Sequence, residues 1–179
     1  MLHRQTGSWL GKSTPVLEPA EFLKRWKIHL QNNRTILLDP RFNLPQGRHH
    51  DRALQQFLLE KSGILADRLR HRRIVDGHVD LRPEHIWLND EVKIIDCLEF
   101  NPRLRAIDPL EELAYLDLEC EHLGAVDFGA YVRSHVMHAL HDDPLFSLFY
   151  FYRCYRAMLR ARLSIAHLHP SHASSLQPE

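Results

Sequence analysis

The polar residues at positions 78–85, together with Asp96, are the part of the chain best suited to chemistry. Asp80 stands inside the segment HVDLRPEH at 78–85, and Asp96 follows the apolar run VKII at 92–95. One carboxylate can accept the proton of an attacking hydroxyl group, and a second one can hold a divalent metal ion. This order of groups is that of a catalytic loop for phosphoryl transfer.

Two short strands are expected to position the two aspartates. Residues 86–88 and 92–95 form β-leaning runs, and the linker 89–91 between them has the length of a hairpin connection. A loop that opens this hairpin would carry Asp80, while the second strand would deliver Asp96 from its far end. We therefore expect both carboxylates to converge on one side of the hairpin.

The rest of the chain is predicted to be mostly helical. Apolar periodicity predicts helices over residues 19–31, 51–72, 109–123, 128–140 and 145–167. Gly124 is expected to stop the third of them, and residues 35–39 are expected to form a short strand or extended segment. The fold class is therefore α+β, with a small β-hairpin at the centre of a mostly helical domain, rather than a doubly wound sheet.

Three positions of the loop match the catalytic loop of protein kinases, H-R-D-L-x-x-x-N. They are His78, Asp80 and Leu81. In kinases the Asp accepts the proton of the substrate hydroxyl, the Asn holds a magnesium ion, and another Asp after the next strand also holds metal. Arg82 stands two residues after Asp80, where kinases often carry a lysine near the transferring phosphate.

A longer set of residues resembles the C-terminal lobe of aminoglycoside phosphotransferase-like proteins, which have a protein-kinase-like fold. The set consists of HVDLRPEHI at 78–86, IDCLEFN at 95–101, LR at 104–105, Asp108 and ELA at 112–114. It is most similar to an uncharacterised bacterial branch whose signature is close to H-G-D-L-x-x-x-[NH] followed by [FI]-D-C-[IL]-E-F-N. Residues 151–162 are similar to the closing helix of that branch. The resemblance covers about residues 37–167.

The resemblance implies ATP-dependent transfer of a phosphoryl group to a hydroxyl group of a small molecule. It implies that Asp80 is the base or the orienting group for the attacking hydroxyl, with Arg82 as a second catalytic residue. His78 and Asp108 would support the site, and Asp108 would do so by tying the backbone of the catalytic loop to the helix that follows. Val79 replaces the usual Gly of H-G-D and adds a β-branched side chain to a tight loop.

The resemblance also implies a metal site formed by His85 and Asp96. His85 falls where most relatives have the Asn ligand. Mg²⁺ prefers oxygen ligands, whereas a histidine nitrogen suits softer cations, so the implied ion is Mg²⁺ or, with His85 as a ligand, Mn²⁺. The cofactors implied for an active protein are this ion and ATP.

Three further charged residues near the motif have two interpretations. Glu99, Arg103 and Arg105 could form ordinary ion pairs, or they could contact a substrate or a phosphate group. Both possibilities stay open from the sequence.

The nucleotide-binding lobe of a kinase-like enzyme is not recognisable before Asp76. That lobe is β-rich and carries a lysine for the phosphates, but the sequence has no glycine-rich turn between strands there. Lys24, Lys27 and Lys61 stand on predicted helices instead. Two hypotheses follow. The chain is the C-lobe of a phosphotransferase whose N-lobe comes from another chain or from upstream sequence, or it is a truncated, noncatalytic kinase-like remnant (a pseudokinase) that acts as an interaction module.

Length and composition indicate one globular domain. The chain has 179 residues, 44% of them hydrophobic, and 23 Lys and Arg balance 23 Asp and Glu. This balance argues against nucleic-acid binding, which needs a basic excess. We expect a flexible segment at 1–18, the kinase-like C-lobe at 19–168 and a disordered tail at 169–179. Nucleotide and a small-molecule acceptor are the expected partners, with a separate N-lobe chain as a further possibility.

Location and redox state are predicted from what the chain lacks. It has neither a leader-like apolar segment nor an apolar run long enough to span a membrane, so we expect a cytoplasmic protein with no membrane partner. The cysteines Cys97, Cys120 and Cys154 are widely spaced and odd in number, which is typical of buried, reduced thiols rather than a disulfide framework or a zinc site.

Overall fold

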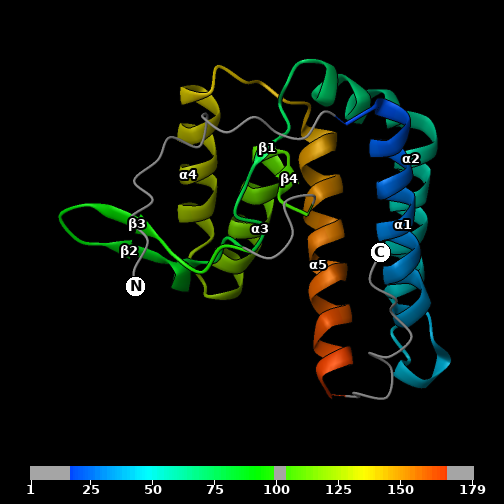
Figure 1. The fold of residues 1–179 in the computed structure, drawn as a ribbon. Helices are drawn as coiled ribbons and strands as arrows, with labels where there is room; N and C mark the ends of the chain where they lie inside the picture. The colour runs from blue at the N-terminus through cyan, green and yellow to red at the C-terminus, as the bar shows by residue number, and fades with distance from the viewer. Residues whose placement is uncertain (1–16, 99–103, 169–179) are drawn as a thin grey trace. The chain divides into compact units, whose positions relative to one another are not determined.

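The structure is a computed structural model that describes residues 17–98 and 104–168 (Figure 1). Contacts between residues divide this part of the chain into two compact units, one of residues 68–152 and one of residues 17–67 with 153–168. Within the described residues there are five α-helices and two small antiparallel sheets. The α+β, mainly helical fold class predicted from the sequence is confirmed.

The first helix of the chain, α1 (Pro19–Leu37), is longer than predicted. The strand expected at residues 35–39 is wrong, because α1 continues to Leu37 and the Thr35 hydroxyl donates a 3.0 Å hydrogen bond to the Gln31 carbonyl. Ile36 and Leu37 are buried and extend the apolar face of the helix. Burial of that face outweighs the strand preference of the β-branched residues at 35 and 36.

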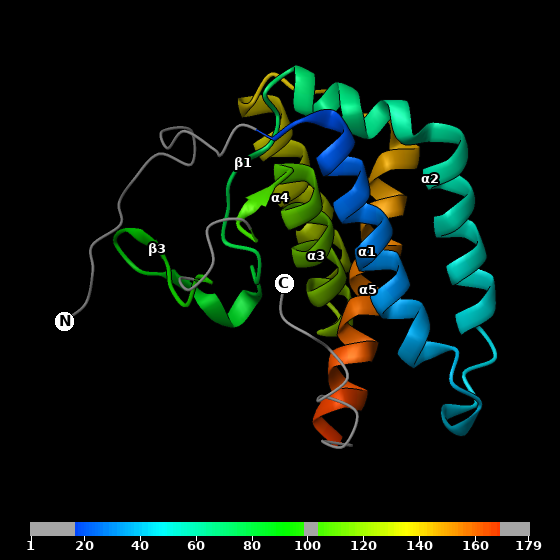
Figure 2. The same ribbon diagram turned by 45° about the vertical axis from the view of Figure 1, so that its right-hand side comes forward.

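The unit of residues 17–67 and 153–168 is built from helices. Besides α1 it contains the 3₁₀ turn η1 (Pro40–Phe42), most of α2 (Gly47–Arg70) and the end of α5 (Phe146–Leu168). Figures 1 and 2 both show α1 beside α2. Buried Trp26 meets Tyr155 edge to face with ring centroids 4.9 Å apart, a favourable aromatic geometry.

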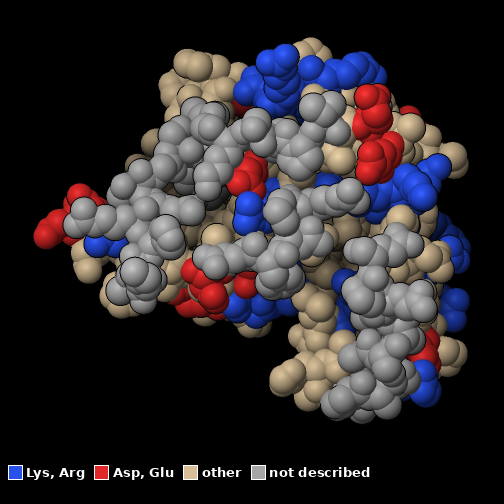
Figure 3. All heavy atoms as spheres, viewed as in Figure 1, with Lys and Arg blue, Asp and Glu red and all other residues tan. Residues whose placement is uncertain are grey.

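The unit of residues 68–152 contains both sheets. β1 (Val75–Asp76) pairs with β4 (Ala106–Ile107), and β2 (Ile86–Leu88) pairs with β3 (Val92–Ile94), both antiparallel. The predicted hairpin is therefore confirmed, with Leu88 opposite Val92 at its end. β1 and β4 are two residues long each, too short to show a pattern in the sequence. Figure 3 shows acidic side chains at the tip of the hairpin.

Helices α3 (Pro109–His122) and α4 (Val126–Ala139) pack against each other. The expected stop of α3 is confirmed, since Gly124 has φ of +81°, a conformation that glycine adopts without steric cost. The core under the candidate loop is formed by Leu81, Leu116 and Cys120. Three partly buried apolar residues pack against it: Ile86, Ile94 and Val132. This core fixes the loop and the hairpin to α3 and α4.

The remaining expectations concern termini, membrane and cysteines. Residues 1–16 and 169–179, which include most of the segments expected to be flexible or disordered, lie outside the described residues. No helix in the described part combines the length and apolarity needed to cross a bilayer.

All three cysteines are free thiols, but only Cys120 is buried, while Cys97 and Cys154 are half-buried. Burial raises the pKa of Cys154 to about 11, so this thiol stays protonated at neutral pH.

Candidate functional site

The chain enters the candidate loop through Gly77, which is pressed against two neighbours. A Cβ atom at this position would collide with Ile107 of β4 and with the Glu112 carboxylate of α3. The Gly77 N–H also donates a 2.8 Å hydrogen bond to the Arg105 carbonyl. Glycine is needed here because only a residue without a side chain permits this close approach.

Val79 is held in a backbone conformation that is unusual for a β-branched residue. Its φ is +74°, in the left-handed region, and its N–H donates a 2.5 Å hydrogen bond to Glu112 Oε1. The left-handed conformation costs a non-glycine residue about 1–2 kcal/mol. The chain therefore carries backbone strain at this position. The fully buried Glu112 carboxylate offsets it.

His78 connects the loop to the segment that carries Asp96. Its buried ring donates a hydrogen bond from Nε2–H to the Ile95 carbonyl at 2.7 Å, and its own carbonyl accepts from the Leu98 N–H at 3.3 Å. Burial lowers the pKa of His78, partly opposed by the bond to Ile95. His78 is therefore neutral at pH 7 and acts as a cross-link rather than a charge.

Arg82 lies at the centre of the charged residues. Its Nη2 is 3.2 Å from Asp80 Oδ2 and 3.1 Å from His85 Nε2, and its Nη1 is 2.8 Å from Glu84 Oε1. A guanidinium group can serve several acceptors at once because its donors form a planar fork. Arg82 therefore links the loop aspartate to His85, the histidine expected as a metal ligand.

His85 connects the loop to Asp96. The His85 ring is buried, its Nδ1–H donates a 2.8 Å hydrogen bond to the Asp80 carbonyl, and its Nε2 lies 3.4 Å from Asp96 Oδ2. Asp96 itself has φ of +63° and a side chain that is 76% exposed. The structure thus brings Asp80, Arg82, His85 and Asp96 together at the base of the hairpin, with Asp96 facing solvent.

The His85–Asp96 pair has the chemistry of two ligands for one divalent cation. Donation from Nδ1 leaves the lone pair of the neutral ring on Nε2, the atom that faces Asp96. Two ligands at metal-bonding distance, about 2.1 Å each, lie roughly 3 Å apart at a right angle. One nitrogen and one oxygen suit Mn²⁺ better than Mg²⁺. Among residues 17–98 and 104–168, no group of three or more His, Cys, Asp or Glu side chains gathers to complete a site.

The side chain of Asp108 stabilises the start of α3 and not the backbone of the loop. It caps α3 by accepting from the Leu110 N–H at 2.9 Å, receives two bonds from Arg68 at 2.7 and 2.8 Å, and accepts from the Tyr152 hydroxyl at 3.1 Å. Arg68 binds Asp142 as well, at 2.8 and 2.6 Å. These bonds stabilise the start of α3, and the expected tie between Asp108 and the loop backbone is not among them.

Glu112, one turn further along α3, makes that tie to the loop and was missed as a site residue. The available signal was its position in the set of residues that resembles the phosphotransferase family. Carboxylates are common in the first turn of a helix because they interact favourably with the helix dipole. The sequence alone therefore does not reveal that this carboxylate also binds the loop.

Of the three charged residues with two interpretations, the structure describes one. Arg105 pairs with Asp76 through Nε at 2.7 Å, which is the ion-pair alternative. Glu99 and Arg103 lie outside the described residues. Lys24 and Lys27 are on α1 and Lys61 is on α2, and no strand precedes β1 in the described part of the chain.

Comparison with known proteins finds relatives in mycobacteria. The chain is 32% identical to the uncharacterized protein Rv2004c of Mycobacterium tuberculosis (strain H37Rv) over an aligned length of 167 residues, covering 80% of this chain and 34% of that protein. The uncharacterized protein Mb2027c of Mycobacterium bovis shows the same identity and coverage. The chain therefore spans about a third of the length of these relatives. No protein family profile and no solved structure matches the chain.

Proposed function

We propose that this chain supplies the catalytic-loop half of an aminoglycoside phosphotransferase-like enzyme, which transfers a phosphoryl group from ATP to a hydroxyl group of a small molecule. The observation that carries the proposal is the row of contacts from Asp80 through Arg82 and His85 to Asp96, at 3.2, 3.1 and 3.4 Å. Phosphoryl transfer depends mainly on positioning and on charge stabilisation, and these four residues offer both.

Each residue has a role in this proposal. Asp80, whose side chain is 41% exposed, orients the acceptor hydroxyl and takes its proton. Arg82, whose guanidinium contacts Asp80 and His85, turns toward the phosphoryl group and stabilises its negative charge. His85 and Asp96 hold a divalent cation. Such a cation, when bound, neutralises charge on the phosphate oxygens.

The lobe that covers ATP belongs, in this proposal, to sequence outside the described residues or to another chain. The mycobacterial relatives support this arrangement, since about two thirds of their length lies beyond the part that this chain matches. A cytoplasmic location would give such a protein access to ATP.

A noncatalytic kinase-like module is the second candidate. It is favoured by Arg82, which in this structure binds both Asp80 and His85 and so occupies the groups that would meet substrate and metal. It is also favoured by the helices, rather than strands, that precede β1 in residues 17–74. The two candidates differ in whether nucleotide and metal displace Arg82.

Nucleotide-dependent stabilisation separates these candidates. The melting temperature would be measured with ATP and Mn²⁺ or Mg²⁺ for the wild type, Asp80→Asn and Asp96→Asn, with Asp90→Asn as the control because Asp90 is an exposed aspartate at the hairpin tip. The phosphotransferase proposal expects a rise with Mn²⁺–ATP that Asp96→Asn removes and Asp90→Asn retains. No rise in any protein at millimolar ATP would favour the noncatalytic module.

A further inference from the structure

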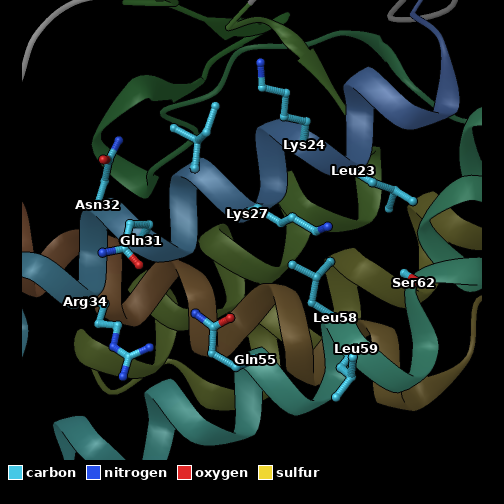
Figure 4. Close-up of a pocket in the computed structure, with 11 residues that line it drawn as sticks. Leu23, Lys24, Lys27, Gln31, Asn32, Arg34, Gln55, Leu58, Leu59 and Ser62 are labelled. Atoms are coloured by element: carbon cyan, nitrogen blue, oxygen red, sulfur yellow. The ribbon is translucent and has the colours of Figure 1, made fainter.

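A groove between α1 and α2 lies within the unit of residues 17–67 and 153–168. It has a volume of about 650 Å³, which is within the usual range of small-molecule sites, about 300–1,000 Å³. In Figure 4, Lys27 and Gln31 of α1 face Gln55 and Leu58 of α2 across it. None of these residues belongs to the candidate phosphoryl-transfer site.

The groove is lined by positive charge without a carboxylate. Lys24, Lys27 and Arg34 line it, and neither Asp nor Glu is among its lining residues in the described part of the chain. Lys24 and Lys27 are exposed, and in residues 17–98 and 104–168 neither has a salt bridge. Arg34 is partly neutralised, since its Nε lies 3.6 Å from Asp51 Oδ2. Two unneutralised ammonium groups on one wall favour an anion.

Apolar side chains from both helices complete the lining. Leu23 and Ile28 project from α1, and Leu58 and Leu59 from α2. Leu59 is 83% exposed, so an apolar ligand that covers its side chain would remove apolar surface from water, which favours binding. Gln31, Gln55 and Ser62 add amide and hydroxyl groups to the lining.

We propose that this groove binds a small organic anion, one with a phosphate or carboxylate head and an apolar body. Lys27 meets the head because it faces the centre of the groove, with Lys24 and Arg34 at its margin (Figure 4). Leu58 and Leu59 meet the apolar body. The volume favours a small molecule over a peptide helix. Among the described residues that line the groove none is aromatic, so they offer no platform for stacking nucleobases. The site is independent of the proposed phosphoryl transfer.

Octyl phosphate, kept below its micelle concentration, is a suitable probe for calorimetric titration of the full chain. Inorganic phosphate tests the head alone, and octyl glucoside tests the same apolar chain with a neutral head. The variants are Lys27→Gln and Leu59→Ser. Lys61→Gln is the matched control, because Lys61 is an exposed lysine of α2 that does not line the groove.

The proposal expects saturable binding of one octyl phosphate per chain. Lys27→Gln should weaken it about tenfold, the effect of losing one charge-assisted hydrogen bond. Leu59→Ser should weaken it severalfold, and Lys61→Gln should leave it within twofold. Inorganic phosphate and octyl glucoside should each bind at least about tenfold more weakly. Unchanged melting temperatures of the variants show that they remain folded.

Three outcomes would overturn the proposal. The first is the absence of saturable binding by the wild type. The second is an equal loss in Lys27→Gln and Lys61→Gln, which would indicate attraction to net charge rather than to the groove. The third is binding to phosphatidylglycerol vesicles without binding of monomeric octyl phosphate, which would assign the surface to membranes instead.

Discussion

The backbone N–H of Val79 donates a 2.5 Å hydrogen bond to Oε1 of Glu112, across 33 positions of sequence. The bond joins the tightest point of the candidate loop to the first turns of α3. It also holds Val79 at a φ of +74°, which a valine does not adopt without support. The geometry of Asp80, the next residue, therefore depends on a carboxylate buried in α3.

Replacing Glu112 should destabilise the protein and release the loop. Because a hydrogen bond to a charged group contributes about 1.5–3 kcal/mol, Glu112→Ala should lower the free energy of unfolding by at least that amount. Glu112→Gln keeps an acceptor and should cost less. Urea denaturation measures both effects, and Glu91→Gln at the exposed hairpin turn is the control. A Glu112→Ala protein as stable as the control would show that the bond contributes nothing.

Replacing Val79 with glycine should stabilise the protein. Relief of the left-handed conformation should stabilise the folded state by about 1–2 kcal/mol. The greater freedom of glycine in the unfolded chain should cancel about 0.5–1 kcal/mol of this stabilisation. We expect a net gain of up to about 1.5 kcal/mol in the free energy of unfolding. Val92→Gly in β3 is the matched control, since an extended valine carries no such strain and its replacement should only destabilise. A loss of stability in both variants would contradict the account of Val79.

The carboxylate of Asp142 should make stability depend on pH in the acid range. Burial alone would raise its pKa, but the hydrogen bonds and charge of Arg68, with the charge of Arg73, outweigh burial and hold the pKa below the usual 3.8. The folded state therefore binds the proton less readily than the unfolded state. The resulting stabilisation is complete above the unfolded pKa and is lost as pH falls through the lower, folded one.

Comparison of the wild type with Asp142→Asn measures this contribution. The difference in their free energies of unfolding should be constant near neutral pH and shrink as pH falls below about 3.8. Asp143→Asn, which replaces an exposed neighbour, is the matched control. A difference for Asp142→Asn that does not change down to pH about 3 would contradict the sign of the pKa shift.

Local patterns were enough to predict the elements whose signals are complete within a few residues. The β2–β3 hairpin follows from two apolar runs with a short polar linker, and the end of α3 follows from Gly124. The end of α1 was predicted incorrectly because residues 35 and 36 favour strands locally, while burial of Ile36 and Leu37 decides for helix. Burial against distant parts of the chain is not visible in a local window.

The same limit applies to the candidate site. Hairpin geometry was sufficient to expect Asp80 and Asp96 on one side, and the contacts through Arg82 and His85 bring them there. The bond from Val79 to Glu112 and the pair Arg68–Asp108 join residues 33 and 40 positions apart. Such contacts depend on tertiary packing, which spacing in the sequence does not encode directly.

The most direct test of the account is whether His85 and Asp96 hold one divalent cation. Binding of Mn²⁺ would be followed by electron paramagnetic resonance, with and without ATP, in the wild type, His85→Gln, Asp96→Asn and Asp90→Asn. The account predicts one bound Mn²⁺ per chain, tighter with ATP, which is lost in His85→Gln and Asp96→Asn and kept in Asp90→Asn. Equal Mn²⁺ binding by all four proteins, or none by the wild type with ATP, would contradict it.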